Sequence, residues 1–151
     1  MIGNLSFSMI KAMIDVRDNQ ASLQDLASTI LHEASRQGAT AAEVSVNEDV
    51  GLEVGARNRE LETVEFSHDR GFSITFYKGK RRGSATATTS NRSSIERTVE
   101  AAKNISDFTE EDDCAGLASP DDLASERKAG LDLELFNFWE ITADGLEDLA
   151  V

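Results

Sequence analysis

The sequence has few of the residues that build redox, disulfide and metal sites. It contains one cysteine, two histidines and one proline among 151 residues. A lone cysteine cannot form an internal disulfide, which fits a reducing cytosol. Two histidines form a metal site only if folding brings them together. Composition therefore points away from a disulfide scaffold or a histidine-rich metal centre.

Long apolar runs and excess positive charge are also missing. No segment approaches the roughly 20 apolar residues that span a bilayer, and the N-terminus lacks the features of a signal peptide. The chain has 28 acidic against 15 basic residues, a formal net charge of −13. Such a surface repels nucleic-acid phosphates. We expect a soluble, cytoplasmic protein with neither a membrane nor a nucleic-acid partner. Its 40% hydrophobic content predicts a folded chain, with one domain or one domain and the start of a second.

Two segments have the apolar spacing of amphipathic helices. The first spans residues 22–37, beginning at Ser22 and ending with Gly38 as C-cap. The second begins at Ser93, and Glu96 at its third position completes a capping box. Its apolar stripe comprises Ile95, Val99, Ala102 and Ile105.

Short alternating runs between the helices predict strands. Turn residues are expected to separate them at 47–49, 58–59, 69–71 and 78–80, giving five strands within 43–47, 50–54, 61–66, 72–77 and 83–88. The last strand has small side chains, which would let a helix or another backbone pack closely. The predicted fold is α+β: a five- or six-stranded, mainly antiparallel sheet (a meander) covered on one face by the two helices.

The composition changes after Asp107. Six acidic residues and no lysine or arginine lie between Phe108 and Asp122, which is typical of a linker or a long surface loop. The final residues read as the first turns of a helix that stops without a terminating signal. We therefore expect part of a longer protein, or alternatively a frayed natural end. The expected organisation is an N-terminal extension (1–19), an α-β(5)-α N-terminal domain (20–107), an acidic linker (108–130), and a docking segment with the truncated start of the next region (131–151).

The histidines lack the neighbours that catalysis needs. His32-Glu33 resembles the start of H-E-x-x-H, but Arg36 occupies the position of the second histidine. That pair is predicted to lie on a solvated helix surface. His68-Asp69 is predicted to lie in a turn, where a metal or acid–base role competes with the commoner bonding of Asp to turn backbone. The structural interpretation is favoured for both pairs.

Two other features were weighed as functional groups. Cys114 has the acidic neighbours Glu111, Asp112 and Asp113, which oppose thiolate formation, so a non-catalytic thiol is predicted. A basic cluster at the 78–82 hairpin tip is predicted to be solvated and to discourage edge aggregation, with a partner contact as the alternative. The glycines match neither a dinucleotide nor a P-loop pattern, and the 84–90 hydroxyls lack a histidine base. No catalytic, cofactor-binding or metal-binding residue is assigned.

Several motifs, in their order and spacing, resemble the N-terminal domain of the TldD/PmbA family, also described as modulators of DNA gyrase. The pattern is closer to the PmbA branch, also called TldE, than to the TldD branch. The resemblance covers about residues 13–151. The residues that carry it are Ala42-Glu-Val-Ser-Val46, Glu62-Thr-Val-Glu-Phe66, Asp69, Gly71, Ile74-Thr-Phe-Tyr77, Arg81-Arg-Gly-Ser-Ala85, 95–102 and Cys114-Ala-Gly116.

This resemblance implies a cytosolic bacterial or archaeal protein about three times this length. TldD and PmbA/TldE form a heterodimeric zinc metallopeptidase for unfolded or small peptides, linked to microcin maturation, antitoxin turnover and gyrase modulation. In TldD the zinc ligands are an H-E-x-x-x-H motif and a distant cysteine, beyond the N-terminal domain. Nothing in this sequence matches that motif, so zinc is implied only for a TldD-like partner subunit.

Two function classes follow from the resemblance. In the first, the chain is the non-catalytic N-terminal domain of a peptidase subunit and contributes substrate-chamber and partner contacts. A sheet edge suits that role, because an extended peptide can add to it by main-chain hydrogen bonds. In the second, the chain is a regulatory or adaptor module without proteolysis, acting in gyrase modulation or toxin–antitoxin control. A downstream H-E-x-x-x-H in a longer sequence would favour a catalytic subunit.

Overall fold

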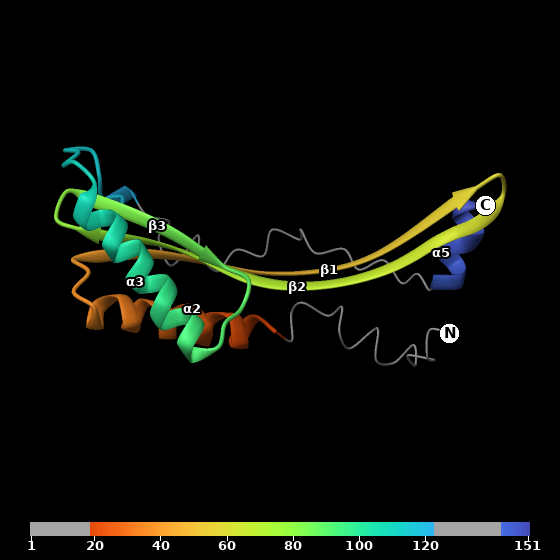
Figure 1. The fold of residues 1–151 in the computed structure, drawn as a ribbon, viewed down its shortest axis with the longest axis horizontal. Helices are drawn as coiled ribbons and strands as arrows, with labels where there is room; N and C mark the ends of the chain where they lie inside the picture. The colour runs from red at the N-terminus through yellow and green to blue at the C-terminus, as the bar shows by residue number, and fades with distance from the viewer. Residues whose placement is uncertain (1–18, 123–142) are drawn as a thin grey trace. The chain divides into compact units, whose positions relative to one another are not determined.

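The computed structural model describes residues 19–122 and 143–151 (Figure 1). The 131–139 part of the expected docking segment lies outside these residues. The helices predicted over 22–37, from 93 and after 141 are all present. The elements in chain order are α2 (Gln20–Arg36), β1 (Ala41–Arg57), β2 (Glu60–Lys78), β3 (Arg81–Ala87), α3 (Arg92–Phe108), the 3₁₀ helix η1 (Pro120–Asp122) and α5 (Ala143–Ala150).

The described residues divide into two compact units. The first comprises residues 19–51 and 67–117 and holds α2, β3, α3 and the adjoining parts of β1 and β2. The second comprises residues 52–66, 118–122 and 143–151. It contains the β1–β2 turn, η1 and α5.

The fold is α+β as expected, but the strands of its sheet are fewer and longer than predicted. Its order is β1-β2-β3, and β2 pairs antiparallel with β3 from Phe72↔Ala87 to Lys78↔Arg81. The predicted turns at 58–59 and 78–80 are present. The turns predicted at 47–49 and 69–71 are wrong, because β1 and β2 continue through them. Three strands in the described residues thus replace the expected five or six.

The apolar residues on either side of each false turn share one parity. Nearest each false turn they are even-numbered, whereas Leu61 and Tyr77 of β2 are odd-numbered, so period-2 alternation continues across the polar positions of each strand. The two interruptions also lie against each other: a Cβ on Gly71 would be 3.4 Å from the Asn47 side-chain oxygen. The Asn47 side chain donates to Asp49 at 2.9 Å, and His68 lies 2.7 Å from Glu48 on the neighbouring strand, so these polar side chains find partners without a turn. The even-numbered apolar residues are Val44, Val46, Val50, Leu52 and Val54 of β1, and Val64, Phe66, Phe72, Ile74 and Phe76 of β2.

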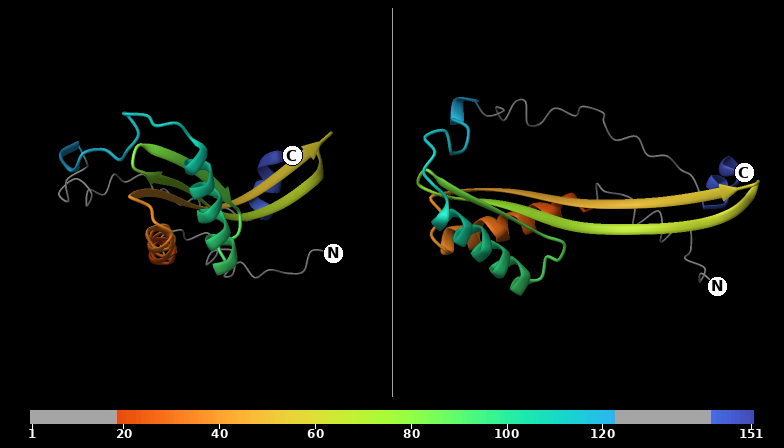
Figure 2. Two further views of the ribbon diagram at one scale, coloured as in Figure 1. Left: turned by 60° about the vertical axis from the view of Figure 1, so that its left-hand side comes forward. Right: turned by 45° about the horizontal axis from the view of Figure 1, so that its top comes forward.

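In the first unit, α2 and α3 cover one face of the sheet (Figures 1 and 2). The small-residued β3 meets α3 closely, as its composition predicted. A Cβ on Gly83 would lie 2.1 Å from the Ala102 carbonyl oxygen and 2.5 Å from the Ser106 amide nitrogen. A bare glycine therefore allows this helix to approach the strand. The buried core is Ile30, Ala34, Phe72, Ile74, Phe76, Ile95, Val99 and Ala102.

The helix ends differ from the predicted caps in detail. Helix α2 ends in a Schellman motif: Gly38 has φ +95°, and the Ala39 amide donates to the Ala34 carbonyl at 3.0 Å. Gly38 thus ends the helix as predicted. Helix α3 is capped by Asn91, whose side-chain oxygen accepts from the Ser94 amide at 2.8 Å. The predicted capping box from Ser93 is wrong because the helix begins at Arg92 with Asn91 as its N-cap, so Ser93 already lies inside the first turn.

In the second unit, a tight turn joins β1 to β2. Asn58 and Arg59 both have positive φ, 54° and 64°, the pattern of a type I′ turn that matches the twist of its strands. Gly55 lies beside Thr63, whose hydroxyl oxygen would be 2.5 Å from an added Cβ. None of the described helices is both long and apolar enough to cross a membrane.

Candidate functional site

The residues singled out in the sequence do not converge on one centre. His32 is exposed on α2, and His68 belongs to β2 rather than to a turn. In residues 19–122 and 143–151, no three His, Cys, Asp or Glu side chains form a group that could hold a metal ion. Each candidate is therefore considered by its own contacts.

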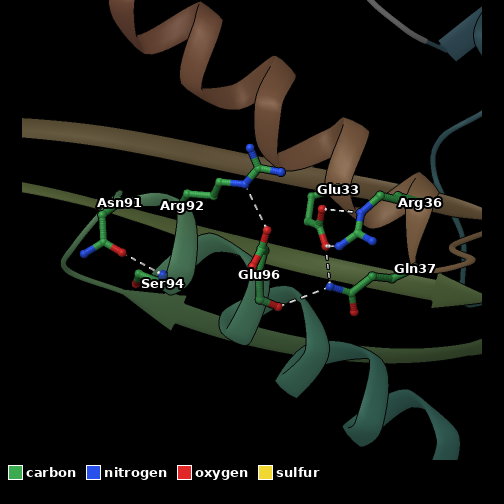
Figure 3. A network of polar contacts seen from close by, with 7 residues as sticks. All are labelled: Glu33, Arg36, Gln37, Asn91, Arg92, Ser94 and Glu96. Atoms are coloured by element: carbon green, nitrogen blue, oxygen red, sulfur yellow. Dashed lines mark hydrogen bonds and ion pairs between the residues drawn. The ribbon is translucent and has the colours of Figure 1, made fainter.

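The polar network between α2 and α3 contains a buried carboxylate (Figure 3). Glu33 is only 8% exposed, so the predicted solvated surface holds for His32 but is wrong for Glu33. The Glu33 carboxylate accepts hydrogen bonds from Arg36 at 2.7 and 2.8 Å and from Gln37 at 2.6 Å. The Gln37 amide also donates to the Glu96 carbonyl at 3.2 Å. Gln37 thereby ties the carboxylate to the second helix.

Electrostatics keep the Glu33 carboxyl ionised. The hydrogen bond from Arg36 lowers the pKa of Glu33, and this outweighs the opposing effect of burial. A carboxylate held ionised and surrounded by donors is a poor general acid. Glu33 therefore works as a packing contact between helices.

His68 makes one short contact on the even face of the β1–β2 pair. Its Nε2 lies 2.7 Å from Glu48 Oε1, and the Glu48 side chain is only 7% exposed. A metal or acid–base pair of His68 with Asp69 was the less favoured alternative from the sequence. Adjacent strand residues project to opposite faces, so the two cannot act as a pair.

Arg70 adds a further polar contact on the same face. Its Nη2 donates to the Ser22 hydroxyl at 3.1 Å, which connects β2 to the first turn of α2. Glu48, His68 and Arg70 are polar residues on the otherwise apolar even face. His68 contacts Glu48, and Arg70 donates to Ser22. These contacts serve packing.

The basic hairpin tip is engaged by the last turn of α3 and by the acidic segment that follows it. The pairs are Lys78–Asp107 at 2.5 Å, Lys80 Nζ with the Asp113 carbonyl at 2.9 Å, and Arg81–Glu111 at 3.5 Å. The hydrogen bond from Lys78 lowers the pKa of Asp107. The tip is thus partly neutralised within the chain, rather than simply solvated.

Cys114 lies at the end of that acidic segment. It is exposed, and its amide donates to the Asp112 side chain at 2.9 Å. The Asp112 amide in turn donates to the Lys80 carbonyl at 3.0 Å. These bonds fold the segment against the hairpin tip, and they give the thiol no basic partner.

An open groove between β3 and α3 was not anticipated from the sequence. Its volume is about 510 Å³, and among the described residues Arg97 is the only charged one in its wall. The small residues of β3 and the serines and threonines before α3 were the available signals, but they were considered only for packing and for nucleophilic chemistry. The lining residues are Ala85, Thr86, Thr89, Asn91, Ser93, Ser94, Arg97, Thr98 and Ala101.

By fold, the first unit is an α+β domain in which two helices cover one face of an antiparallel sheet. A family model described as PmbA/TldA metallopeptidase domain 1 matches residues 42–106. The Metalloprotease PmbA homolog of Haemophilus influenzae is 36% identical over 136 residues, covering 90% of this chain and 29% of the relative. Metalloprotease PmbA of Escherichia coli O157:H7 is 37% identical over 141 residues, covering 93% and 30%.

Two solved structures share the fold. TldE from Thermococcus kodakarensis has a TM-score of 0.57 and 16% identity, covering 63% of this chain and 22% of its own. A proposed modulator of DNA gyrase from Bacteroides thetaiotaomicron has a TM-score of 0.61 and 20% identity, covering 68% and 23%. The chain belongs to the TldD/PmbA family and carries its N-terminal domain. It spans about 30% of the length of the curated relatives it matches.

The relatives' description as metalloproteases implies a metal ion, and the described residues do not fit one. Glu48 and His68 supply two adjacent groups, but Asp69 projects to the other face of the sheet. A protein zinc site generally needs at least three ligands. No catalytic step is therefore derived through a metal in the described part of this chain.

Proposed function

We propose that the chain is the N-terminal domain of a PmbA/TldE-like subunit in a TldD/TldE-type zinc metallopeptidase that acts on unfolded or small peptides in the cytoplasm. In this proposal the domain is non-catalytic and provides substrate-chamber and partner contacts. The observation that carries the proposal is the match to PmbA relatives over at least 90% of the chain, with residues 42–106 matching the family's first domain.

The contacts of the candidate groups support a non-catalytic role. The Glu33 carboxylate holds Gln37, which bonds to α3, and His68 of β2 bonds to Glu48 of β1, so both groups support packing. The sheet face opposite the helices is polar, with the Thr75 and Ser84 hydroxyls 3.0 Å apart. The outer edge of β3 has no strand partner in the described residues. Such surfaces suit contacts with a partner subunit or an extended peptide.

Co-expression with a TldD-like subunit tests the proposal. The full-length protein that contains this domain should co-purify with that subunit, and hydrolysis of an unfolded peptide should require both. The isolated 151-residue chain should neither hydrolyse peptides nor retain stoichiometric zinc. Tight one-to-one zinc in the isolated chain, lost in His68→Ala, would overturn the non-catalytic assignment.

A regulatory module without proteolysis is the second candidate. It is favoured by the likeness in fold to the proposed gyrase modulator. The two candidates separate in one experiment with the full-length protein. An effect on gyrase supercoiling without a TldD-like subunit or peptide hydrolysis would favour the regulatory module.

A further inference from the structure

The outer edge of β3 is an unpaired strand edge that borders the β3–α3 groove. Lys78 and Arg81 flank a two-residue turn in which Gly79 has φ +62°, so they form a hydrogen-bonded pair of the hairpin. Hydrogen-bonded and non-hydrogen-bonded pairs alternate along an antiparallel ladder. The main-chain groups of Gly83, Ala85 and Ala87 therefore point toward β2.

The main-chain groups of the alternate residues of β3 point away from β2. Arg82, Ser84 and Thr86 direct their amide and carbonyl groups to the outer edge, where no further strand pairs with β3 in the described residues. The side chains of Ser84 and Thr86 are exposed and small enough to leave that edge open. An extended chain could therefore add there by main-chain hydrogen bonds.

The groove gives this edge a second wall. Thr86 and Ala85 lie on the strand side, while Ser94, Arg97 and Thr98 lie on the helix side. An added strand would direct alternate side chains toward α3. There they would meet short hydroxyl residues and a single cation.

Arg97 supplies the charge preference. It is exposed, and it makes no ion pair in the described residues, whereas Arg92 on the same helix pairs with Glu96 at 3.1 Å. A carboxylate on the added strand would complement Arg97 within hydrogen-bonding reach. The net charge of −13 repels acidic ligands at long range, but salt at about 0.15 M screens charges beyond roughly 8 Å and leaves the direct contact.

We propose that the β3 edge and the β3–α3 groove bind an extended peptide segment of a separate chain that carries an acidic side chain facing Arg97. The proposal deepens the proposed function by naming a peptide site and its charge preference, and it rests on that function only in taking a peptide as the ligand.

A binding experiment on this chain alone tests the site. The probe is a fluorescent, unstructured peptide with one Asp flanked by Val and Thr residues, compared with the same peptide carrying Asn. In about 0.15 M salt, the Asp peptide should bind roughly twofold to fivefold more tightly, the range of an exposed ion pair. Arg97→Gln should remove that difference. Arg92→Gln is the matched control and should preserve it, because Arg92 does not line the groove.

Alternate N-methylation of the probe tests the strand edge without altering the protein. Methylating the amides on one edge of the peptide should weaken binding about tenfold or more, because two or three main-chain hydrogen bonds are lost. Methylating the other edge should have little effect. Equal binding of both methylated probes, or equal effects of the two arginine variants, would overturn the proposal.

The oligomeric state provides a further outcome. A concentration-dependent dimer in sedimentation that resists the peptide and is lost in Thr86→Pro would assign the edge to a second copy and overturn the proposal. The assay contains no TldD-like subunit. If peptide binding fails while the subunits assemble and hydrolyse peptides, only this inference fails, and the proposed function stands.

Discussion

Replacing Gly83 with alanine tests whether the close approach of α3 to β3 determines the stability of the first unit. The new Cβ would lie 2.1 Å from the Ala102 carbonyl oxygen, whereas ordinary contacts begin near 3.4 Å, a shortfall of about 1.3 Å. It would also lie 2.5 Å from the Ser106 amide nitrogen. Both atoms belong to the helix backbone, so no side-chain rotation relieves the clash. The helix must move away from the strand.

That movement would loosen the packing of α3 on the core. Val99 and Ala102 of this helix are fully buried in the core. Overpacking of a well-packed core costs about 1–3 kcal/mol. We take the upper end because two backbone atoms are involved. Replacing glycine by alanine also stabilises the fold by roughly 0.4–1 kcal/mol, because it lowers the conformational entropy of the unfolded chain. The expected net loss is therefore about 2–2.6 kcal/mol, or a fall in Tm of roughly 10–20 °C for a domain of this size.

Gly71→Ala is the matched control, because it is the same change in the same sheet. There the added Cβ would lie 3.2 Å from the Ala87 carbonyl oxygen and 3.4 Å from Asn47 Oδ1, which neighbours can accommodate by small shifts. We expect a change within about 1 kcal/mol in urea unfolding followed by circular dichroism. The reasoning is refuted if both variants unfold at the same urea concentration with unchanged slopes.

Three further predictions concern a cap, a turn and a buried carboxylate. Asn91→Ala should cost about 1 kcal/mol in urea unfolding, because it leaves the Ser94 amide at the start of α3 without its acceptor; Asn104→Ala, at an exposed site on the same helix, is the control. Arg59→Gly should stabilise the chain by roughly 0.5–1 kcal/mol, since it relieves a positive φ of 64° at a turn position that favours glycine; a loss of stability would contradict this turn assignment. The lowered pKa of Glu33 means that its stabilising contribution is complete above its unfolded-state pKa, about 4.3, and is lost as pH falls through the lower folded value. In acid titrations of unfolding free energy, Glu33→Gln should reduce the pH dependence below about pH 5, and an unchanged acid limb would contradict the assignment.

The helices could be predicted from sequence because their signals are local. The apolar spacing of Ile30 and Ala34, or of Ile95 and Val99, appears within a few turns of the chain. The glycine that ends α2 is equally local, since Gly38 needs only its own positive φ and the preceding turn. The error in the predicted cap of α3 is also local. Ser93 and Asn91 both have side chains suited to an N-cap, and the Asn91 side chain is the one that accepts from the Ser94 amide.

The two false turns show what local signals lack. Asn47-Glu-Asp49 and Asp69-Arg-Gly71 have the composition of turns. Whether a chain turns there depends on what lies across the sheet, and that requires the pairing of residues about 20 positions apart. The sequence did hold one indication: Val46 and Val50 are both even-numbered. A continuous strand requires two residues on one face to have the same parity, whereas residues separated by a turn can have either.

The same limit explains why the β3–α3 groove could not be predicted. Its walls come from the end of β3 and the start of α3, which lie side by side only once the chain has folded. Small residues in a strand predict close packing on their own face, and Gly83 fulfils that prediction. They do not indicate whether the neighbouring edge stays open. Arg97 becomes a candidate binding residue only because it lies beside an unpaired edge of β3 in the described residues. That spatial relation is not encoded in either segment alone.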